Sequence, residues 1–86
     1  MFCSYILKSL KDGGYYYGHT KDLQLRLQKH NGGKVRSTKS RIPLIVHYFE
    51  SFETKSEAYK QEIFWKSAEG KIYLRGKKVI GDGRSV

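Results

Sequence analysis

Two helical patterns in the sequence place polar side chains beside apolar ones. In the stretch "LQLRLQKHN", Arg26 and His30 are four positions apart, so a helix would hold them side by side. Both border the apolar stripe formed by Leu23 and Leu27. They are either a functional pair, or an arginine stem over the edge of the core and a histidine that caps the last carbonyls of the helix.

The second pattern lies in "EAYKQEIFWK", where Glu62 falls in the middle of an otherwise apolar arc. The other members of that arc are Ala58, Tyr59, Ile63 and Trp65. An ionised carboxylate on an apolar face is unfavourable unless it is paired or binds a metal ion. Two interpretations therefore stay open for Glu62: an ion pair with an arginine from another element, such as Arg26, or a metal ligand at the edge of a cleft.

Tyrosines gather in the short run "YYYG". In a strand, Tyr15 and Tyr17 would lie on one face and Tyr16 on the other, and Tyr5 could share a face with either set. Such rings often pack across strands without any other role. A phenol can also orient an attacking water or take its proton, which requires nearby positive charge. A bound metal or basic neighbours could supply that charge: Arg26, His19 and Lys21.

The elements that must position these side chains follow from hydrophobic periodicity and turn residues. Their order is two strands, a helix, a basic connection, a strand and a helix. This order predicts an α+β fold with a small antiparallel three-stranded sheet flanked by helices. The expected strands are residues 2–9, 15–18 and 44–49, and the expected helices are residues 21–31 and about 57–66.

Local signals refine this outline. Thr20 is expected to cap the first helix, and Thr54 or Ser56 the second. The run "LIVHYF" predicts a central strand that is buried on both faces, with His47 as a structural residue. The basic stretch "KVRSTKSR" is either a loop or a short helix. A single domain over residues 1–80 is expected, with a frayed tail at 81–86.

The composition points to an acidic partner. Lysine and arginine number 17 against 8 acidic residues, for a net charge of +9 in 86 residues. Nucleic acid is the leading candidate for this partner. A single cysteine excludes an internal disulfide. Without a membrane-spanning run or a signal-peptide pattern, we expect a cytoplasmic protein and no membrane partner.

The ordered set of motifs resembles a GIY-YIG nuclease domain of the small standalone type. The first signature corresponds to Tyr5 with the Ile-Leu that follows it, and the second to the Tyr-x-Gly that begins at Tyr16. Arg26 lies eight residues after that glycine, and His30 four residues later. The stretch "SEAYKQE" resembles the acidic helix of the family. The likeness covers residues 2–66, with two departures: Cys3 replaces a glycine, and His19 stands where several relatives carry lysine or another polar residue.

The resemblance implies metal-dependent hydrolysis of phosphodiester bonds. Glu62 would hold one Mg²⁺ or Mn²⁺, and Arg26 would stabilise charge on the phosphate. Tyr16 would orient or activate the water, Tyr5 would line the pocket, and His30 would contact phosphate or relay a proton. Nucleic acid, DNA rather than RNA, would be bound by basic residues: His19, Lys21, Lys34, Arg36, Lys39 and Arg41. We expect a monomer, and the alternative is a non-catalytic nucleic-acid-binding module of the same fold.

Overall fold

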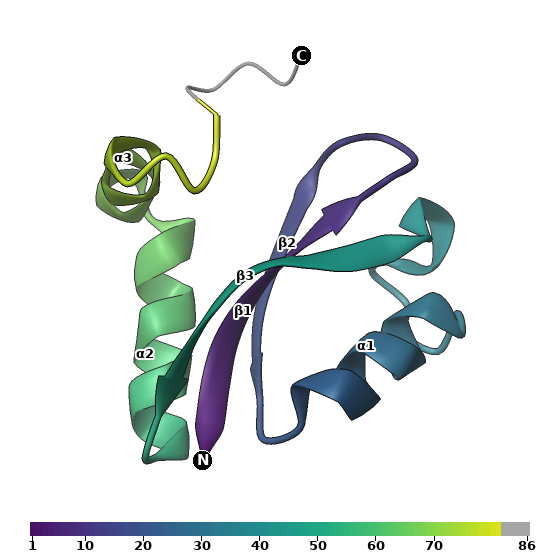
Figure 1. Cartoon of the computed structure of the whole chain (residues 1–86), viewed down its shortest axis with the longest axis horizontal. Helices are drawn as coiled ribbons and strands as arrows, with labels where there is room; N and C mark the ends of the chain where they lie inside the picture. Colours follow the sequence, from purple (N-terminus) through teal and green to yellow (C-terminus); the bar gives the residue numbers. More distant parts are fainter. Residues whose placement is uncertain (82–86) are drawn as a thin grey trace.

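The protein folds as an antiparallel three-stranded sheet with helices on both faces (Figure 1). The computed structural model describes residues 1–81. The strands are β1 (Phe2–Ser9), β2 (Tyr15–Thr20) and β3 (Leu44–Phe52). The helices are α1 (Leu23–Asn31), the 3-10 turn η1 (Lys39–Arg41), α2 (Lys55–Lys66) and α3 (Ala68–Gly76). The predicted fold class is confirmed, and within these residues no helix has both the length and the apolar character to cross a membrane.

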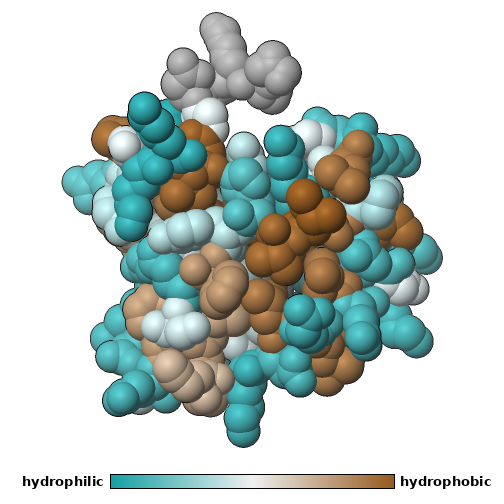
Figure 2. Space-filling view, viewed as in Figure 1, coloured by the Kyte–Doolittle hydropathy of each residue, from teal (hydrophilic) through white to brown (hydrophobic). Residues whose placement is uncertain are grey.

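Strand β1 is the centre of the sheet, in the order β2-β1-β3. The prediction that residues 44–49 form the central strand is wrong, because β3 pairs only with β1 within the described chain. The difference shows in burial: residues 3–7 of β1 are all buried, whereas Ile45 and Phe49 of β3 are 42% and 52% exposed. Figure 2, viewed as in Figure 1, shows hydrophobic side chains gathered near the middle of the face that is turned to the viewer.

Side-chain alternation along β1 divides the interior into two cores. Cys3, Tyr5 and Leu7 lie on the α1 side, where Leu44 completes the cluster. Ile6 lies on the opposite side and packs with Trp65 of α2 and Leu74 of α3. The predicted division of the tyrosines is confirmed, because they pack on these two clusters as alternation requires. Tyr16 joins the first, and Tyr15 and Tyr17 join the second.

The start of α1 differs from the prediction. Thr20 remains in β2 opposite Cys3, so it does not cap the helix. The cap is Asp22, whose carboxylate accepts a hydrogen bond of 3.1 Å from the Leu25 amide. A carboxylate at this position also suits the positive end of the helix dipole. The sheet thus extends two residues beyond the predicted end of its second strand, and the helix begins correspondingly later.

Helix α2 begins two residues before the expected start and uses one of the two expected caps, and it is followed by a helix that was not predicted. Thr54 caps α2 through a reciprocal capping box with Glu57. Ser67 ends α2 and also caps α3, because its hydroxyl accepts a 3.0 Å bond from the Gly70 amide. The predicted structural role of His47 fits its bond to the carbonyl of Val79. The basic connection is turn and 3-10 helix, and most of the predicted frayed tail, residues 82–86, lies outside the described residues.

The close packing of α3 on α2 generates a test of the fold. A Cβ at Gly70 would lie 1.7 Å from the carbonyl oxygen of Phe64, whereas one at Gly76 would meet nothing within 4 Å. We expect Gly70→Ala to destabilise the protein by at least ~1–3 kcal/mol, because the backbone of α2 must shift. Gly76→Ala, the matched control, is expected to be neutral or to stabilise by up to ~1 kcal/mol. Equal unfolding free energies in chemical denaturation would contradict this packing.

Candidate active site at the edge of strand β2

Gly18 is the point around which the candidate site is built. It lies in the edge strand β2, directly opposite Tyr5 of β1. A Cβ at this position would lie 2.5 Å from the Tyr5 hydroxyl oxygen and 2.6 Å from Cζ. Only a residue without a side chain lets the phenol lie across the backbone of β2. The glycine of the Tyr-x-Gly motif therefore positions the tyrosine of the neighbouring strand.

The Tyr5 hydroxyl is held by two residues of α1. It lies 3.3 Å from His30 Nε2, and Arg26 Nε donates to it at 3.4 Å. On the far side of the imidazole, Nδ1 is 2.7 Å from Thr38 Oγ1, which in turn lies 3.4 Å from the Val35 carbonyl. One assignment satisfies every group: threonine donates to the carbonyl, His30 Nδ1 donates to threonine, and Tyr5 donates to Nε2. The imidazole thus fixes the direction of the phenol.

Burial sets the protonation states in this network. His30 is fully buried, and burial together with the nearby Arg26 charge lowers its pKa to about 4. Tyr5 is only 1% exposed, and burial raises its pKa despite the opposing hydrogen bond from Arg26. The bond to Tyr5 raises the pKa of Arg26. At neutral pH the network therefore holds a neutral imidazole, a neutral phenol and a charged guanidinium.

Glu62 approaches the same strand from the opposite face of the sheet. Its Oε1 is 2.6 Å from His19 Nδ1, and its Oε2 accepts a 2.6 Å bond from Lys66 Nζ, one turn further along α2. His19 pairs in register with Ser4, whose hydroxyl bonds the Ala58 carbonyl of α2, so His19 faces α2 as well. The interpretation that Glu62 pairs with Arg26 is wrong, because Arg26 lies with Tyr5 on the α1 side of the sheet.

The two halves meet at the edge of β2. Tyr16 lies two residues before Gly18 in β2. Its ring packs against the imidazole of His30, with the ring centroids 5.0 Å apart. Glu62 is close enough that its charge adds to burial in raising the pKa of Tyr5. The five residues that the sequence singled out as catalytic thus surround one strand: Tyr5, Tyr16, Arg26, His30 and Glu62. The structure brings them together although they come from four elements.

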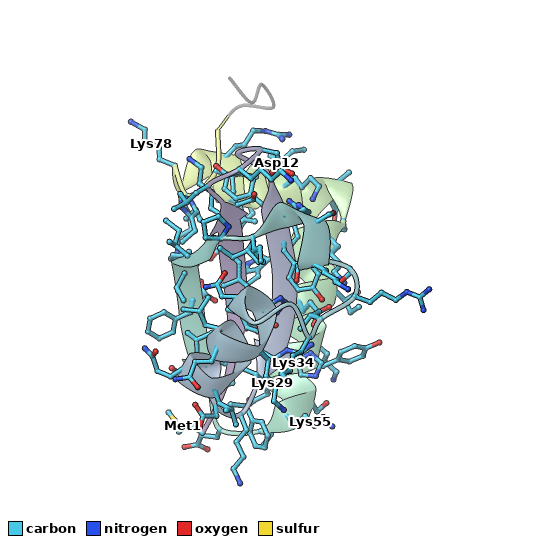
Figure 3. The ribbon with its side chains drawn as sticks, turned by 90° about the vertical axis from the view of Figure 1, so that its right-hand side faces the viewer. Met1, Asp12, Lys29, Lys34, Lys55 and Lys78 are labelled. Carbon is cyan, nitrogen blue, oxygen red and sulfur yellow. The ribbon has the colours of Figure 1, made fainter. Side chains whose placement is uncertain are left out.

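The basic residues expected at nucleic acid fall into two groups. Four of them are exposed: Lys21, Lys34, Arg36 and Lys39. Figure 3 looks onto α1 and labels Lys34 together with two further lysines, Lys29 and Lys55, in the lower part of the view. The other two have partners within the chain. Arg41 bonds Asp12 at 3.3 Å and the Tyr15 carbonyl, which ties the β1–β2 turn to η1, and His19 bonds Glu62.

A metal ion at this site would depend on a single carboxylate. Among residues 1–81, no three His, Cys, Asp or Glu side chains converge to form a metal site. Mg²⁺ nevertheless suits such a site, because it is commonly held by one or two carboxylates, with water and substrate phosphates completing its shell. Glu62 fits that role, since its buried carboxylate already holds the ammonium of Lys66, which is itself 50% exposed. An arriving cation would take the place of this ammonium.

Two residues of the site were missed in the sequence. Thr38 orients His30 and is fully buried, but it lies in the basic connection, where no periodicity marks it as an inward-facing residue. Lys66 had a usable signal, because a lysine four residues after a glutamate pairs with it on a helix surface. For Thr38 only the tertiary structure supplies the contact.

Comparisons with known proteins show which family the chain resembles. The model of the GIY-YIG catalytic domain matches residues 1–78. A UPF0213 protein of Staphylococcus aureus is 45% identical over 76 residues, covering 87% of this chain and 85% of the relative. UPF0213 proteins of Bacillus licheniformis and Bacillus pumilus are 41% and 47% identical, covering 78% and 73% of this chain and 69% and 64% of their own lengths. Among solved structures, none gives a significant match.

The depressed pKa of His30 predicts how stability depends on pH. The unfolded chain protonates this histidine near pH 6.5, whereas the folded chain does so near pH 4. Between these values the unfolded state binds more protons, so stability falls as the pH is lowered, by at most ~1.4 kcal/mol per pH unit. We expect melting temperatures measured from pH 7 to pH 4 to show this slope, and His30→Gln to flatten it. His47→Gln, the control, should keep it; an unchanged slope in His30→Gln would contradict the assignment.

The packing of Tyr5 over Gly18 predicts the effect of one added methyl group. Gly18→Ala must push the phenol away from His30 and Arg26, because its Cβ would overlap the Tyr5 ring. We expect a loss of ~1–3 kcal/mol in unfolding free energy. The double variant Gly18→Ala with Tyr5→Ala removes the clash, so it should be no less stable than Tyr5→Ala alone. Additive losses across this cycle would show that the two residues do not interact.

Proposed function

Because the chain belongs to the GIY-YIG family of catalytic domains, we propose that it is an endonuclease that hydrolyses phosphodiester bonds with the help of a divalent metal ion. The observation that carries this proposal is the convergence of two tyrosines, Arg26, His30 and Glu62 around Gly18, described above. We further propose that the nucleic acid is DNA, that the enzyme acts as a monomer, and that it works in the cytoplasm.

Arg26 is suited to hold the reacting phosphate. Its Nε is used in the bond to Tyr5, which fixes the plane of the guanidinium and directs its terminal amino groups. A planar, permanently charged group can donate two parallel hydrogen bonds to phosphate oxygens. Its charge would then stabilise the negative charge that develops on phosphorus oxygens in the transition state.

The tyrosines and His30 divide the remaining work. Tyr16 is half-buried and would orient the attacking water or accept its proton, with Arg26 as the nearby positive charge. Tyr5 is almost fully buried, and we propose that it holds Arg26 and lines the floor of the site. His30 is neutral and buried, so its proposed role is to orient Tyr5 rather than to neutralise a phosphate.

The metal ion would be Mg²⁺ or Mn²⁺, held by Glu62. When bound, it supplies Lewis-acid stabilisation of the phosphate. Without the metal ion, the bonds from His19 and Lys66 orient both carboxylate oxygens of Glu62. The ammonium of Lys66 also balances the charge of the carboxylate. Lys66 is the partner expected to give way, because its half-exposed ammonium can return to water.

The basic surface supports binding of a polyanion. The exposed residues Lys21, Lys34, Arg36 and Lys39 would contact phosphates, which contribute affinity without sequence preference. A non-catalytic nucleic-acid-binding module would share this surface. The two functions are separated by incubating the purified chain with labelled single-stranded, duplex and flap DNA, and the same strands in RNA, with Mg²⁺, Mn²⁺ or EDTA. Metal-dependent cleavage supports the nuclease, and binding without turnover in any arm supports the module.

Glu62→Gln gives the sharpest test of the metal site. The amide keeps the shape of the carboxylate and removes its charge, so we expect metal-dependent cleavage to be lost. The ion pair that disappears joins Glu62 to a half-exposed lysine, and such pairs contribute only ~0–1 kcal/mol. The amide oxygen of glutamine can still accept the bond from His19, so the melting temperature should change little. Glu50→Gln is the control, because Glu50 bonds Tyr48 and Gln61 away from the site and should retain activity. A Glu62→Gln variant that still cleaves with Mg²⁺ would exclude Glu62 as the metal ligand.

A further inference from the structure

A depression beside the candidate site has no role in the chemistry described above. It is lined by four residues: His19, Lys55, Ser56 and Tyr59. Its volume of ≈ 530 Å³ lies in the range of about 300–1,000 Å³ that small-molecule sites occupy. Its wall is continuous with the active site, because His19 also bonds the Glu62 carboxylate.

Tyr59 gives this depression its character. The side chain lies on α2 and is 51% exposed, although aromatic rings contribute most to stability when they are buried. Its ring meets His19 in an edge-to-face arrangement with centroids 5.3 Å apart, at an angle of 63°. The imidazole of His19 contacts the Tyr59 ring on one side, while about half of the surface of Tyr59 stays open to solvent. A ring that is contacted on one side and open on the other can receive a flat ligand.

The neighbours of Tyr59 define the chemistry of that ligand. Lys55 supplies a positive charge and Ser56 a hydroxyl, both one turn earlier on α2. An open aromatic face beside a cation suits a nucleotide, with the base on the ring and the phosphate on the ammonium. Tyr59 also lies three residues before Glu62, so the two side chains are neighbours on one helix face. A base held on Tyr59 would thus belong to a nucleotide next to the phosphate at Glu62.

We propose that Tyr59 forms a stacking subsite for the base of a nucleotide adjacent to the cleaved phosphodiester bond. This proposal rests on the nuclease function proposed above. Because a base inside a duplex is already stacked and paired, the nucleotide at this position must be unpaired or turned out of the helix. Stacking on a π face requires no particular base, so the subsite sets the geometry of the strand rather than its sequence.

The test uses an oligonucleotide that the wild-type chain cleaves at one position, together with a series in which single nucleotides around that position are abasic. Binding is measured by fluorescence anisotropy in EDTA, and cleavage is measured with Mg²⁺. We expect one abasic position to weaken binding by roughly 5- to 150-fold, the effect of losing one base–aromatic stack. Tyr59→Ala should weaken binding of the intact strand by the same factor, and Tyr59→Phe, which keeps the ring, should bind normally.

The decisive readout is the combination of the two changes. If the base stacks on Tyr59, the abasic substitution does not weaken binding any further in the Tyr59→Ala variant. The two losses of affinity are then not additive. Tyr73→Ala removes another partly exposed tyrosine, on α3, and should leave both binding and the abasic profile as in the wild type. Melting temperatures of the variants show whether each is folded.

Two results would overturn the subsite. Fully additive losses would show that Tyr59 acts only by supporting His19, and a flat abasic profile in a wild-type chain that cleaves would show that no base is held there. In either case the nuclease function stands. If the wild-type chain neither binds nor cleaves any strand, the proposed function fails and the subsite fails with it.

Discussion

The contact between the Tyr5 phenol and the backbone of Gly18 is the constraint on which the candidate site depends. A side chain on the edge strand would fill the space that the ring occupies. With that space open, the phenol reaches His30 and Arg26, and these residues in turn fix the position of α1 against the sheet. The same contact brings the α1 half of the site to the strand that carries His19 toward Glu62.

Charge is distributed unequally between the two halves of this site. On the α1 side, burial keeps Tyr5 and His30 neutral, so Arg26 is the only group of that network to carry charge. On the α2 side, the charge of Glu62 is balanced by the ammonium of Lys66, and its other carboxylate oxygen is bonded by His19. Under the proposed function, a phosphate would meet the guanidinium of Arg26 on one side and, on the opposite side, the carboxylate proposed to hold the metal ion. Such an arrangement would need little reorganisation on binding.

Much of the buried surface of this small domain lies on its central strand. Residues 3–7 of β1 contribute side chains to both cores. Helix α1 packs on one face of this strand, and helices α2 and α3 pack on the other face. The edge strands are then available for other tasks. β2 carries the site, whereas β3 leaves Ile45 and Phe49 exposed. In a chain of 86 residues, concentrating burial in one strand leaves enough surface for a site that must remain accessible.

The sequence by itself determined the order of the elements as far as α2 and the alternation of the tyrosines, and it proposed residues for the candidate site, because periodicity and motif spacing are local properties of the chain. It misplaced β3 at the centre of the sheet, since an apolar run looks the same in a central strand and in an edge strand. It left the partner of Glu62 open and did not reveal Thr38 as the support of His30. Strand order, the pairing of Glu62 with Lys66 and His19, and the burial that keeps His30 neutral were decided only by the tertiary structure, because each depends on which distant surfaces come together.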